Sequence, residues 1–288
     1  MKMHTDHYFH IGFAHLGGGS PCQDYAISQV YKGAAMAVVS DGCSTGGNTD
    51  VGSRIMALTV MAAMRDHRDL NHEVCATETP LEIDIRQGIV LAGTQKILNL
   101  SLRDMLATCI YAYVTPAGGF IHVKGDGVVA FKYRSGNIVM SKFEWENNMP
   151  YYPAYKNGSL DSFIEAHGND LRAVRLVEEE WRKEGDAEPV MSDCNGYTLA
   201  EGIEGITINI SEQAMDEDLE FIVIFSDGIA QIDKLDWQKA VLDFMNFKSF
   251  KGEFAKRRMI RGIKNAEGFG KGPFDDVSYA VIRIERDE

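Results

Sequence analysis

Two segments of the chain have the same form, an apolar run followed at once by Ser-Asp-Gly. The first is Ala-Met-Ala-Val-Val-Ser-Asp-Gly, ending at Gly42, and the second is Phe-Ile-Val-Ile-Phe-Ser-Asp-Gly, ending at Gly228. Asp-Gly usually marks a hairpin turn between two strands. Here each phrase leads through a short polar stretch into a helical pattern, so a hairpin does not fit. Asp41 and Asp227 therefore end buried strands, where an unpartnered carboxylate is costly and a cation is its natural partner.

Three further acidic phrases border apolar runs of strand length. Gln23-Asp24 precedes the run 25–30, Asp275-Asp276 precedes 277–284, and Gly125-Asp126-Gly127 separates 120–123 from 128–133. Each alone could be a solvated turn carboxylate, and for Gly125-Asp126-Gly127 a plain hairpin is an equally good interpretation. Several aspartates with few histidines suit Mg²⁺ or Mn²⁺, which prefer oxygen ligands. Two such ions can share a bridging carboxylate, activate a water and screen a phosphate.

The order of the apolar patterns indicates the fold class. Further strand-like runs are 34–39, 106–114, 119–123, 203–210 and 221–225, and helical patterns are 50–65, 81–100, 236–247 and 250–265. In the first helix, Val51, Ile55, Leu58 and Ala62 are expected to form the buried face. Strands and helix pairs do not alternate as in a parallel α/β sheet. This favours an α+β fold with helices covering packed antiparallel sheets.

Composition limits the function classes. The 45% hydrophobic and 25% charged fractions are typical of a globular protein, and we expect one domain over residues 1–288. The polar and aromatic segment at about 142–202 is interpreted as an insertion, which could line a peptide surface or pack a small core of its own. A net charge of −13 opposes binding to nucleic acid or an anionic membrane.

The cysteines and the chain start give the expected compartment. Five widely spaced cysteines without a Cys-x-x-Cys pair suggest neither a disulfide framework nor a structural zinc site. The first eleven residues lack the apolar core of a signal peptide, and no stretch approaches 18 apolar residues. We therefore expect a cytoplasmic protein.

Taken in order, these phrases resemble the motifs of the PP2C family of metal-dependent protein phosphatases, and the resemblance extends from about residue 12 to residue 285. The matching segments are Gln23-Asp24, Asp41-Gly42, the strand 106–114 with Ala107 and Thr108, Gly125-Asp126-Gly127, Ser226-Asp227-Gly228 and Asp275-Asp276-Val277-Ser278. The chain is identified as a divergent, bacterial-type member. The resemblance implies a four-layer αββα sandwich, with two stacked antiparallel sheets flanked by helix pairs and the metals in a cleft at one edge.

The resemblance also implies roles for individual residues. Asp41 would bridge two divalent cations, Mn²⁺ or Mg²⁺, while the Gly42 carbonyl helps to hold one of them. Asp227 and Asp275 would bind the first metal, and Asp24 would contact the second. Asp275 is preferred over Asp276 as the ligand. Asp126 matches an aspartate that supports a third, weaker metal. Asp41 and Asp227 are the predicted catalytic residues.

Three departures from the family pattern affect residues that would surround the metals and assist catalysis. Cys43 replaces the histidine that serves as general acid, and a thiol titrating near 8.5 is a poor substitute at pH 7. Gln23 replaces a glutamate, which removes one negative charge. The arginine that binds the substrate phosphate in the family pattern is missing, and His15 or the backbone amides of the glycine run 17–19 could bind the phosphate instead.

The sequence therefore predicts a phosphatase that hydrolyses phosphoserine or phosphothreonine in protein substrates by a metal-activated water. Two alternatives stay open. One is a pseudophosphatase that only binds a phosphorylated partner, and the other is a metal-dependent hydrolase of small phosphate esters.

Overall fold

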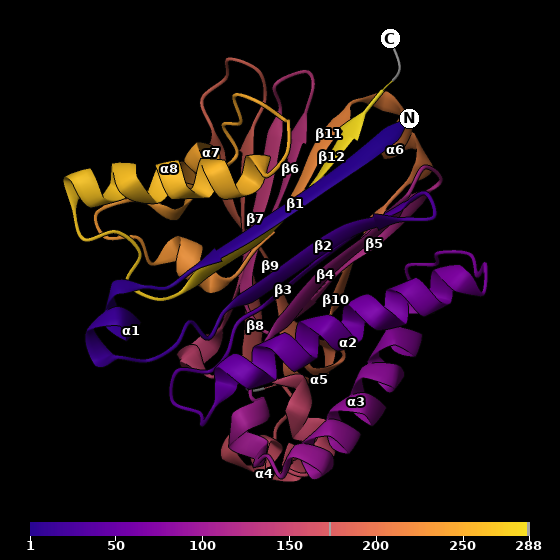
Figure 1. The fold of residues 1–288 in the computed structure, drawn as a ribbon, viewed down its shortest axis with the longest axis vertical. Coiled ribbons are helices and arrows are strands. Elements are labelled where there is room, and N and C mark those ends of the chain that lie inside the picture. Colours follow the sequence, from indigo (N-terminus) through magenta and orange to yellow (C-terminus); the bar gives the residue numbers. More distant parts are fainter. Residues whose placement is uncertain (173, 287–288) are drawn as a thin grey trace.

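The computed structural model describes residues 1–172 and 174–286, and its strands form two antiparallel sheets (Figure 1). In spatial order the larger sheet contains β1 (Lys2–His10), β12 (Val277–Glu285), β11 (Leu219–Phe225), β6 (Gly127–Tyr133), β7 (Ile138–Trp145), β8 (Arg175–Lys183) and β9 (Val190–Thr198). The smaller sheet contains β10 (Ile206–Ile210), β5 (Gly118–Lys124), β4 (Cys109–Thr115), β3 (Ala34–Ser40) and β2 (Tyr25–Tyr31). The antiparallel pairing agrees with the predicted fold class.

Helices cover the outer face of each sheet. The longer ones are α2 (Thr49–Asp69), α3 (Thr79–Leu98), α7 (Trp237–Phe244) and α8 (Phe254–Phe269). The short ones are α1 (Phe13–Gly18), α4 (Leu160–Ala166), α5 (Leu199–Glu204) and α6 (Glu212–Glu217), with the 3₁₀ turns η1 (Leu102–Met105), η2 (Glu146–Asn148), η3 (Pro153–Asn157) and η4 (Asp227–Ala230). Within the described residues, none of these helices has the length and apolar character needed to cross a membrane.

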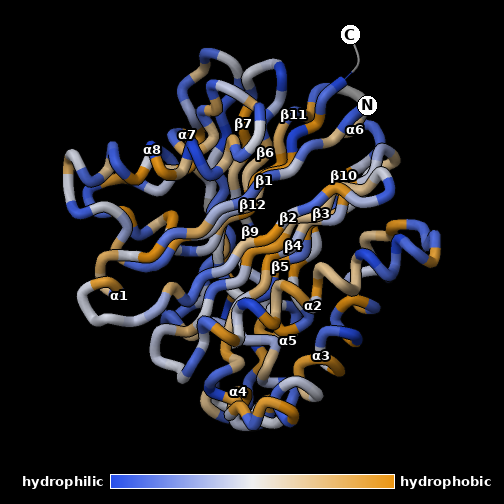
Figure 2. The backbone as a smooth tube through the Cα atoms, in the orientation of Figure 1, coloured by the Kyte–Doolittle hydropathy of each residue, from blue (hydrophilic) through white to orange (hydrophobic). Residues whose placement is uncertain are grey.

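Three hydrophobic clusters show that the molecule has four layers. The central cluster lies between the two sheets, where β3, β4 and β12 contribute alternate side chains. A second cluster joins the larger sheet to α7 and α8, and a third joins the smaller sheet to α2 and α3. In Figure 2 the apolar residues accordingly concentrate along the strands. The predicted αββα sandwich is confirmed.

The buried face of α2 differs from the prediction. The side chains in contact with the sheet come from Met56, Val60 and Met64, whereas Leu58 and Ala62 face solvent. The sequence also carries glycine and serine at positions 52 and 53, and this small-residue patch lets the first turn approach η1 closely. A Cβ at position 52 would clash with the backbone carbonyl oxygen of residue 104. The contact face of the helix therefore combines Met56, Val60 and Met64 with the small residues of the first turn.

Two segments differ from their predicted roles. Residues 203–210 do not form one strand, because α5 extends to Glu204 and β10 begins at Ile206, with Gly205 at a φ of 87° between them. The segment 142–202 contributes β8 and β9 to the larger sheet. Its Trp145 and Tyr151 are buried in the cluster between the sheets, so they do not form a core of their own.

The hairpin interpretation of Gly125-Asp126-Gly127 is wrong. The strand before this phrase, β5, belongs to the smaller sheet, and the strand after it, β6, belongs to the larger one. The phrase therefore crosses between the two sheets. Positive φ angles at Gly125 (101°) and Gly127 (142°) permit the crossing, which favours glycine at both positions.

Candidate functional site

Four of the predicted aspartates lie at the open ends of two strand pairs, one from each sheet. In the smaller sheet, β2 and β3 pair Tyr25 with Ser40, which places Asp24 next to Asp41. In the larger sheet, β11 pairs with β12, so that Asp227 and Asp275 flank the same end. The sandwich thereby gathers residues from both ends of the chain.

Ser226 connects the two strand pairs. Its hydroxyl donates a hydrogen bond of 2.6 Å to Asp24 Oδ2 in the other sheet. The Ser226 hydroxyl oxygen also accepts a hydrogen bond of 2.9 Å from the backbone N–H of Ser278. The serine of the repeated Ser-Asp-Gly phrase thus fixes the position of Asp24.

Asp41 is the central carboxyl of the group. It lies within hydrogen-bonding reach of both Asp24 and Asp227. Burial, followed by the charges of these two neighbours, raises the pKa of Asp41 well above its usual range. Burial also raises the pKa of Asp24 to about 7. Burial and the charge of Asp275 raise the pKa of Asp227 to about 6. In the absence of a cation, these carboxyls must share protons.

The surroundings of this group fit a cation. The charges that contribute most to the raised pKa values of Asp24, Asp41 and Asp227 belong to other carboxylates. Asp24 Oδ1 is buried and has no hydrogen-bond partner among the described residues. Asp41 and Asp227 are only partly buried, so the group is open to solvent on one side. Oxygen-only donors of this kind match Mg²⁺ or Mn²⁺.

Asp126 belongs to the same electrostatic group. It is buried, and burial followed by the charge of Asp227 raises its pKa well above the usual range. Glu144 and Asp24 contribute smaller effects of the same sign. The crossing between the sheets therefore brings a fifth predicted aspartate to the site.

The closing pair Asp275-Asp276 divides into two environments. Asp276 is buried and accepts backbone hydrogen bonds from Gly12 (2.7 Å) and Gln23 (2.6 Å). Asp275 is partly exposed. This difference agrees with the preference for Asp275 as the residue that faces a metal, because both Asp276 oxygens are engaged in holding the chain.

His15, the predicted phosphate contact, lies on α1 beside this pair. Its Nδ1 is 2.9 Å from Asp276 Oδ2 and 3.7 Å from Asp275 Oδ1. The start of α1 is held by backbone hydrogen bonds from Phe13 and Ala14 to the segment 273–274. His15 is therefore part of the site, and one of its ring nitrogens already contacts a carboxylate.

The loop after Asp41 is held by η1 and by the residues that follow it. Gly42 forms an isolated bridge with Ala107, and the Asp41 carbonyl accepts a hydrogen bond of 2.8 Å from the Thr108 N–H. Asp104 accepts hydrogen bonds from the backbone and side chain of Asn48, at 2.7 and 2.9 Å. A Cβ on Gly42 would lie 2.7 Å from the carbonyl oxygen of residue 49, so only glycine fits there.

One residue at the site was not predicted from the sequence as a member of it. Tyr152 is buried, and after burial the contacts that raise its pKa are the Cys43 thiol and the charge of Asp41. No sequence motif marks this residue, because it reaches the site only through folding.

Comparison with known proteins supports the same family. The family model described as Protein phosphatase 2C matches residues 11–259. No curated protein sequence matches the chain. A serine/threonine phosphatase from Staphylococcus aureus has a similar fold, with a TM-score of 0.55 at 12% identity over 99% of this chain and 96% of the other.

Two further solved structures have a similar fold. The Mycobacterium tuberculosis serine/threonine phosphatase gives a TM-score of 0.52 at 13% identity, over 99% of this chain and 100% of the other. A structure described as a bacterial serine phosphatase gives a TM-score of 0.55 at 11% identity, over 100% of both chains. At these identities the structures establish a shared architecture.

Proposed function

Because the chain belongs to the protein phosphatase 2C family, we propose that it is a metal-dependent phosphatase acting on phosphoserine and phosphothreonine in proteins. The observation that carries this proposal is the group of buried and partly buried carboxyls centred on Asp41, whose desolvation and mutual repulsion raise the pKa values of Asp24, Asp41 and Asp227. Such a group is stable at neutral pH when cations replace the shared protons.

We propose the following ligand roles. Asp41 would hold both of two divalent cations, Mn²⁺ or Mg²⁺, since its carboxyl already contacts carboxyls from both sheets. Asp227 and Asp275 would hold the first cation and Asp24 the second, and the Gly42 carbonyl would help to hold one of them. Asp126 would support a third, weaker position. When bound, the cations supply the Lewis acidity that activates water toward phosphorus and offsets phosphate charge.

The chain's own residues position the reaction. Ser226 holds Asp24, and Gln231 Nε2 donates a hydrogen bond of 2.8 Å to Asp227 Oδ2, so both carboxyls have fixed orientations. Fixed ligands keep a water in line with the phosphorus–oxygen bond that breaks. The attack forms a new bond from the water oxygen to phosphorus and releases the serine or threonine hydroxyl, which needs one proton.

Several side chains are placed to bind the phosphate or to supply this proton. His15 on α1 is the candidate for the phosphate. The Cys43 thiol and the Tyr152 hydroxyl, in contact with each other beside Asp41, are the candidate proton donors. Thiols and phenols in general hold their protons tightly at neutral pH, so we expect slow turnover.

The test uses carboxamide variants that keep the shape of the site. Asp41→Asn and Asp227→Asn should each abolish Mn²⁺-dependent hydrolysis of a phosphothreonine peptide, a loss of about 1000-fold or more on the scale of lost metal and charge stabilisation. Phosphate release is measured with Mn²⁺, with Mg²⁺ and with chelator. The control is Asp236→Asn, an exposed aspartate before α7.

Retention of full activity in either variant would contradict the proposal. The loss of the histidine and arginine of the family pattern favours the pseudophosphatase as second candidate. That candidate predicts negligible turnover in the unmodified protein and in Asp227→Asn alike, with phosphopeptide binding retained. Faster hydrolysis of small phosphate esters than of phosphopeptides would favour the third candidate.

A further inference from the structure

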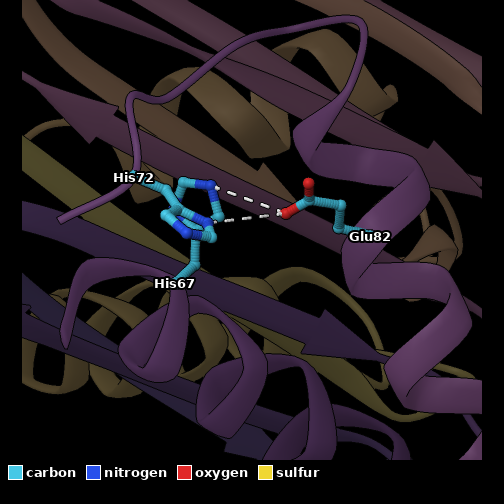
Figure 3. Close-up of side chains that lie close together, drawn as sticks. All are labelled: His67, His72 and Glu82. Carbon is cyan, nitrogen blue, oxygen red and sulfur yellow. Dashed lines mark ion pairs between the residues drawn. The ribbon is translucent and has the colours of Figure 1, made fainter. Parts of the chain in front are cut away.

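A second group of possible metal ligands lies where α2 is connected to α3. His67 is in the last turn of α2, His72 follows it in the connection, and Glu82 is in the first turn of α3. Figure 3 shows the three side chains directed toward one another. Glu82 Oε2 lies 3.9 Å from His67 Nε2 and 4.0 Å from His72 Nδ1. All three ligand atoms lie within 4.8 Å of one another.

This group is separate from the acidic site. Asp41 precedes the N-terminal end of α2, whereas His67 lies near its C-terminal end. From Thr49 at the start of α2 to His67 the helix axis spans about 27 Å, at about 1.5 Å per residue. In Figure 1 the two ends of α2 lie on opposite sides of the molecule. The two sites therefore share no ligand.

His67 is held as a metal-binding histidine usually is. It is buried, and its Nδ1 lies 3.2 Å from the Tyr113 hydroxyl on β4. Such an outer contact at one ring nitrogen normally sets the orientation of the imidazole, so that the other nitrogen can bind a metal. His67 Nε2 lies 3.5 Å from Thr79 Oγ1, a long contact that a bound metal would replace.

The other two ligands can move to complete the geometry. His72 and Glu82 are about half exposed, with side-chain exposures of 50% and 54%. Ligand atoms bound to zinc at about 2.0–2.1 Å in a tetrahedron lie about 3.4 Å apart. The two distances from Glu82 Oε2 exceed this spacing by about 0.5 and 0.6 Å, and the histidine nitrogens lie within 4.8 Å of each other. A pocket of about 520 Å³, lined also by Cys75 and Glu78, leaves room for a fourth, exchangeable ligand.

We propose that His67, His72 and Glu82 bind one Zn²⁺ ion, with Nε2, Nδ1 and a carboxylate oxygen as the ligands and the fourth position open to the pocket. Two imidazoles and one carboxylate suit zinc, whereas Mg²⁺ and Mn²⁺ prefer the oxygen-only donors of the acidic site. This site does not depend on the cysteines, whose spacing indicated no structural zinc site, because its ligands are two histidines and a glutamate. The ion would join the end of α2 to the start of α3 and so stabilise the helix pair.

The experiment measures binding directly. Metal-free protein in saturating Mg²⁺, which occupies the acidic site, is titrated with Zn²⁺ by calorimetry and with Co²⁺ by visible absorption. We expect one Zn²⁺ per chain, a tetrahedral Co²⁺ spectrum and a Zn²⁺-dependent rise in melting temperature. His72→Ala and Glu82→Gln should each weaken Zn²⁺ binding about tenfold or more and reduce the rise in melting temperature.

The matched control is Glu73→Gln. Glu73 is exposed and lines the same pocket but is not one of the three ligands, so this variant should bind Zn²⁺ as the unmodified protein does. Binding without a fixed stoichiometry, or equal affinity in His72→Ala, Glu82→Gln and the unmodified protein, would overturn the proposal. The variants at 72 and 82 replace exposed side chains, so folding is retained and is verified by circular dichroism. None of these readouts depends on phosphatase activity.

Discussion

At the scale of single residues, Cys43 has the largest chemical consequence for the proposed reaction. Its Sγ lies 3.3 Å from Thr45 Oγ1 and beside Tyr152, just after Asp41-Gly42. The family pattern has histidine at this position. An imidazole titrating near 6.5 generally releases a proton at neutral pH far more readily than a thiol titrating near 8.5.

We predict that Cys43→His raises kcat toward a phosphothreonine peptide at pH 7 about tenfold or more, since a matched general acid contributes about 10²–10⁴ in rate. Steady-state phosphate release at saturating Mn²⁺ measures the effect. Cys43→Ala is the control for the change in volume. If Cys43→His were no faster than Cys43→Ala, the position would have no part in proton delivery.

At the scale of secondary structure, α3 is attached to the smaller sheet by few side chains. Ile83, Gln87 and Leu91 are buried, whereas Ile89 and Ile97 are exposed. The helix therefore buries a narrow stripe of side chains and leaves other apolar residues exposed to solvent.

A buried ion pair adds to this attachment. Asp84 on α3 pairs with Lys124 on β5, and their side chains are 11% and 3% exposed. The pKa of Asp84 is raised by burial, while the charge of Lys124 acts in the opposite direction. The pair therefore stabilises the fold only as long as both partners are present.

We predict that Asp84→Leu lowers the free energy of unfolding by about 3–5 kcal/mol, because it leaves the Lys124 ammonium buried and unpaired. The double variant Asp84→Leu/Lys124→Met should recover most of this loss. Urea unfolding of the single and double variants measures both values. Equal stabilities of the two variants would show that the buried ammonium is not the source of the loss.

At the scale of the whole molecule, the acidic site opposes folding when it contains no metal. Burial raises the pKa of Asp24 to about 7 in the folded protein, against about 3.9 in an unfolded chain. Between these two values the folded state binds more protons than the unfolded state. The free energy of unfolding contributed by this group therefore decreases as pH rises from about 4 to about 7.

We predict that metal-free protein loses stability relative to Asp24→Asn as pH rises through this window, because asparagine does not titrate. Comparing the two proteins removes the contributions of histidines, which titrate in the same range. Urea unfolding in chelator at about pH 4.5, 6 and 7.5 measures the difference, and Mn²⁺ should restore stability most strongly at the highest pH. A difference that does not change with pH would contradict the raised pKa.

The whole chain also bears on domain organisation. Residues 142–202 contribute β8 and β9 to the larger sheet and aromatic side chains to the core between the sheets. We therefore propose that residues 1–288 act as one domain. The sequence did not show these strands, because charged residues interrupt their apolar alternation, as in the run Glu178-Glu179-Glu180 of β8, where even Glu178 is buried.

The sequence by itself determined the fold class and predicted the five aspartates that the structure brings together, because apolar runs and the carboxylates that end them are local patterns in the chain. It did not determine that Met56, Val60 and Met64 form the buried face of α2, or that Gly125-Asp126-Gly127 crosses between sheets. Only the tertiary structure decided that Tyr152 lies at the acidic site and that His67, His72 and Glu82 meet. Such contacts join separate elements, and their spacing in the chain carries no periodic signal.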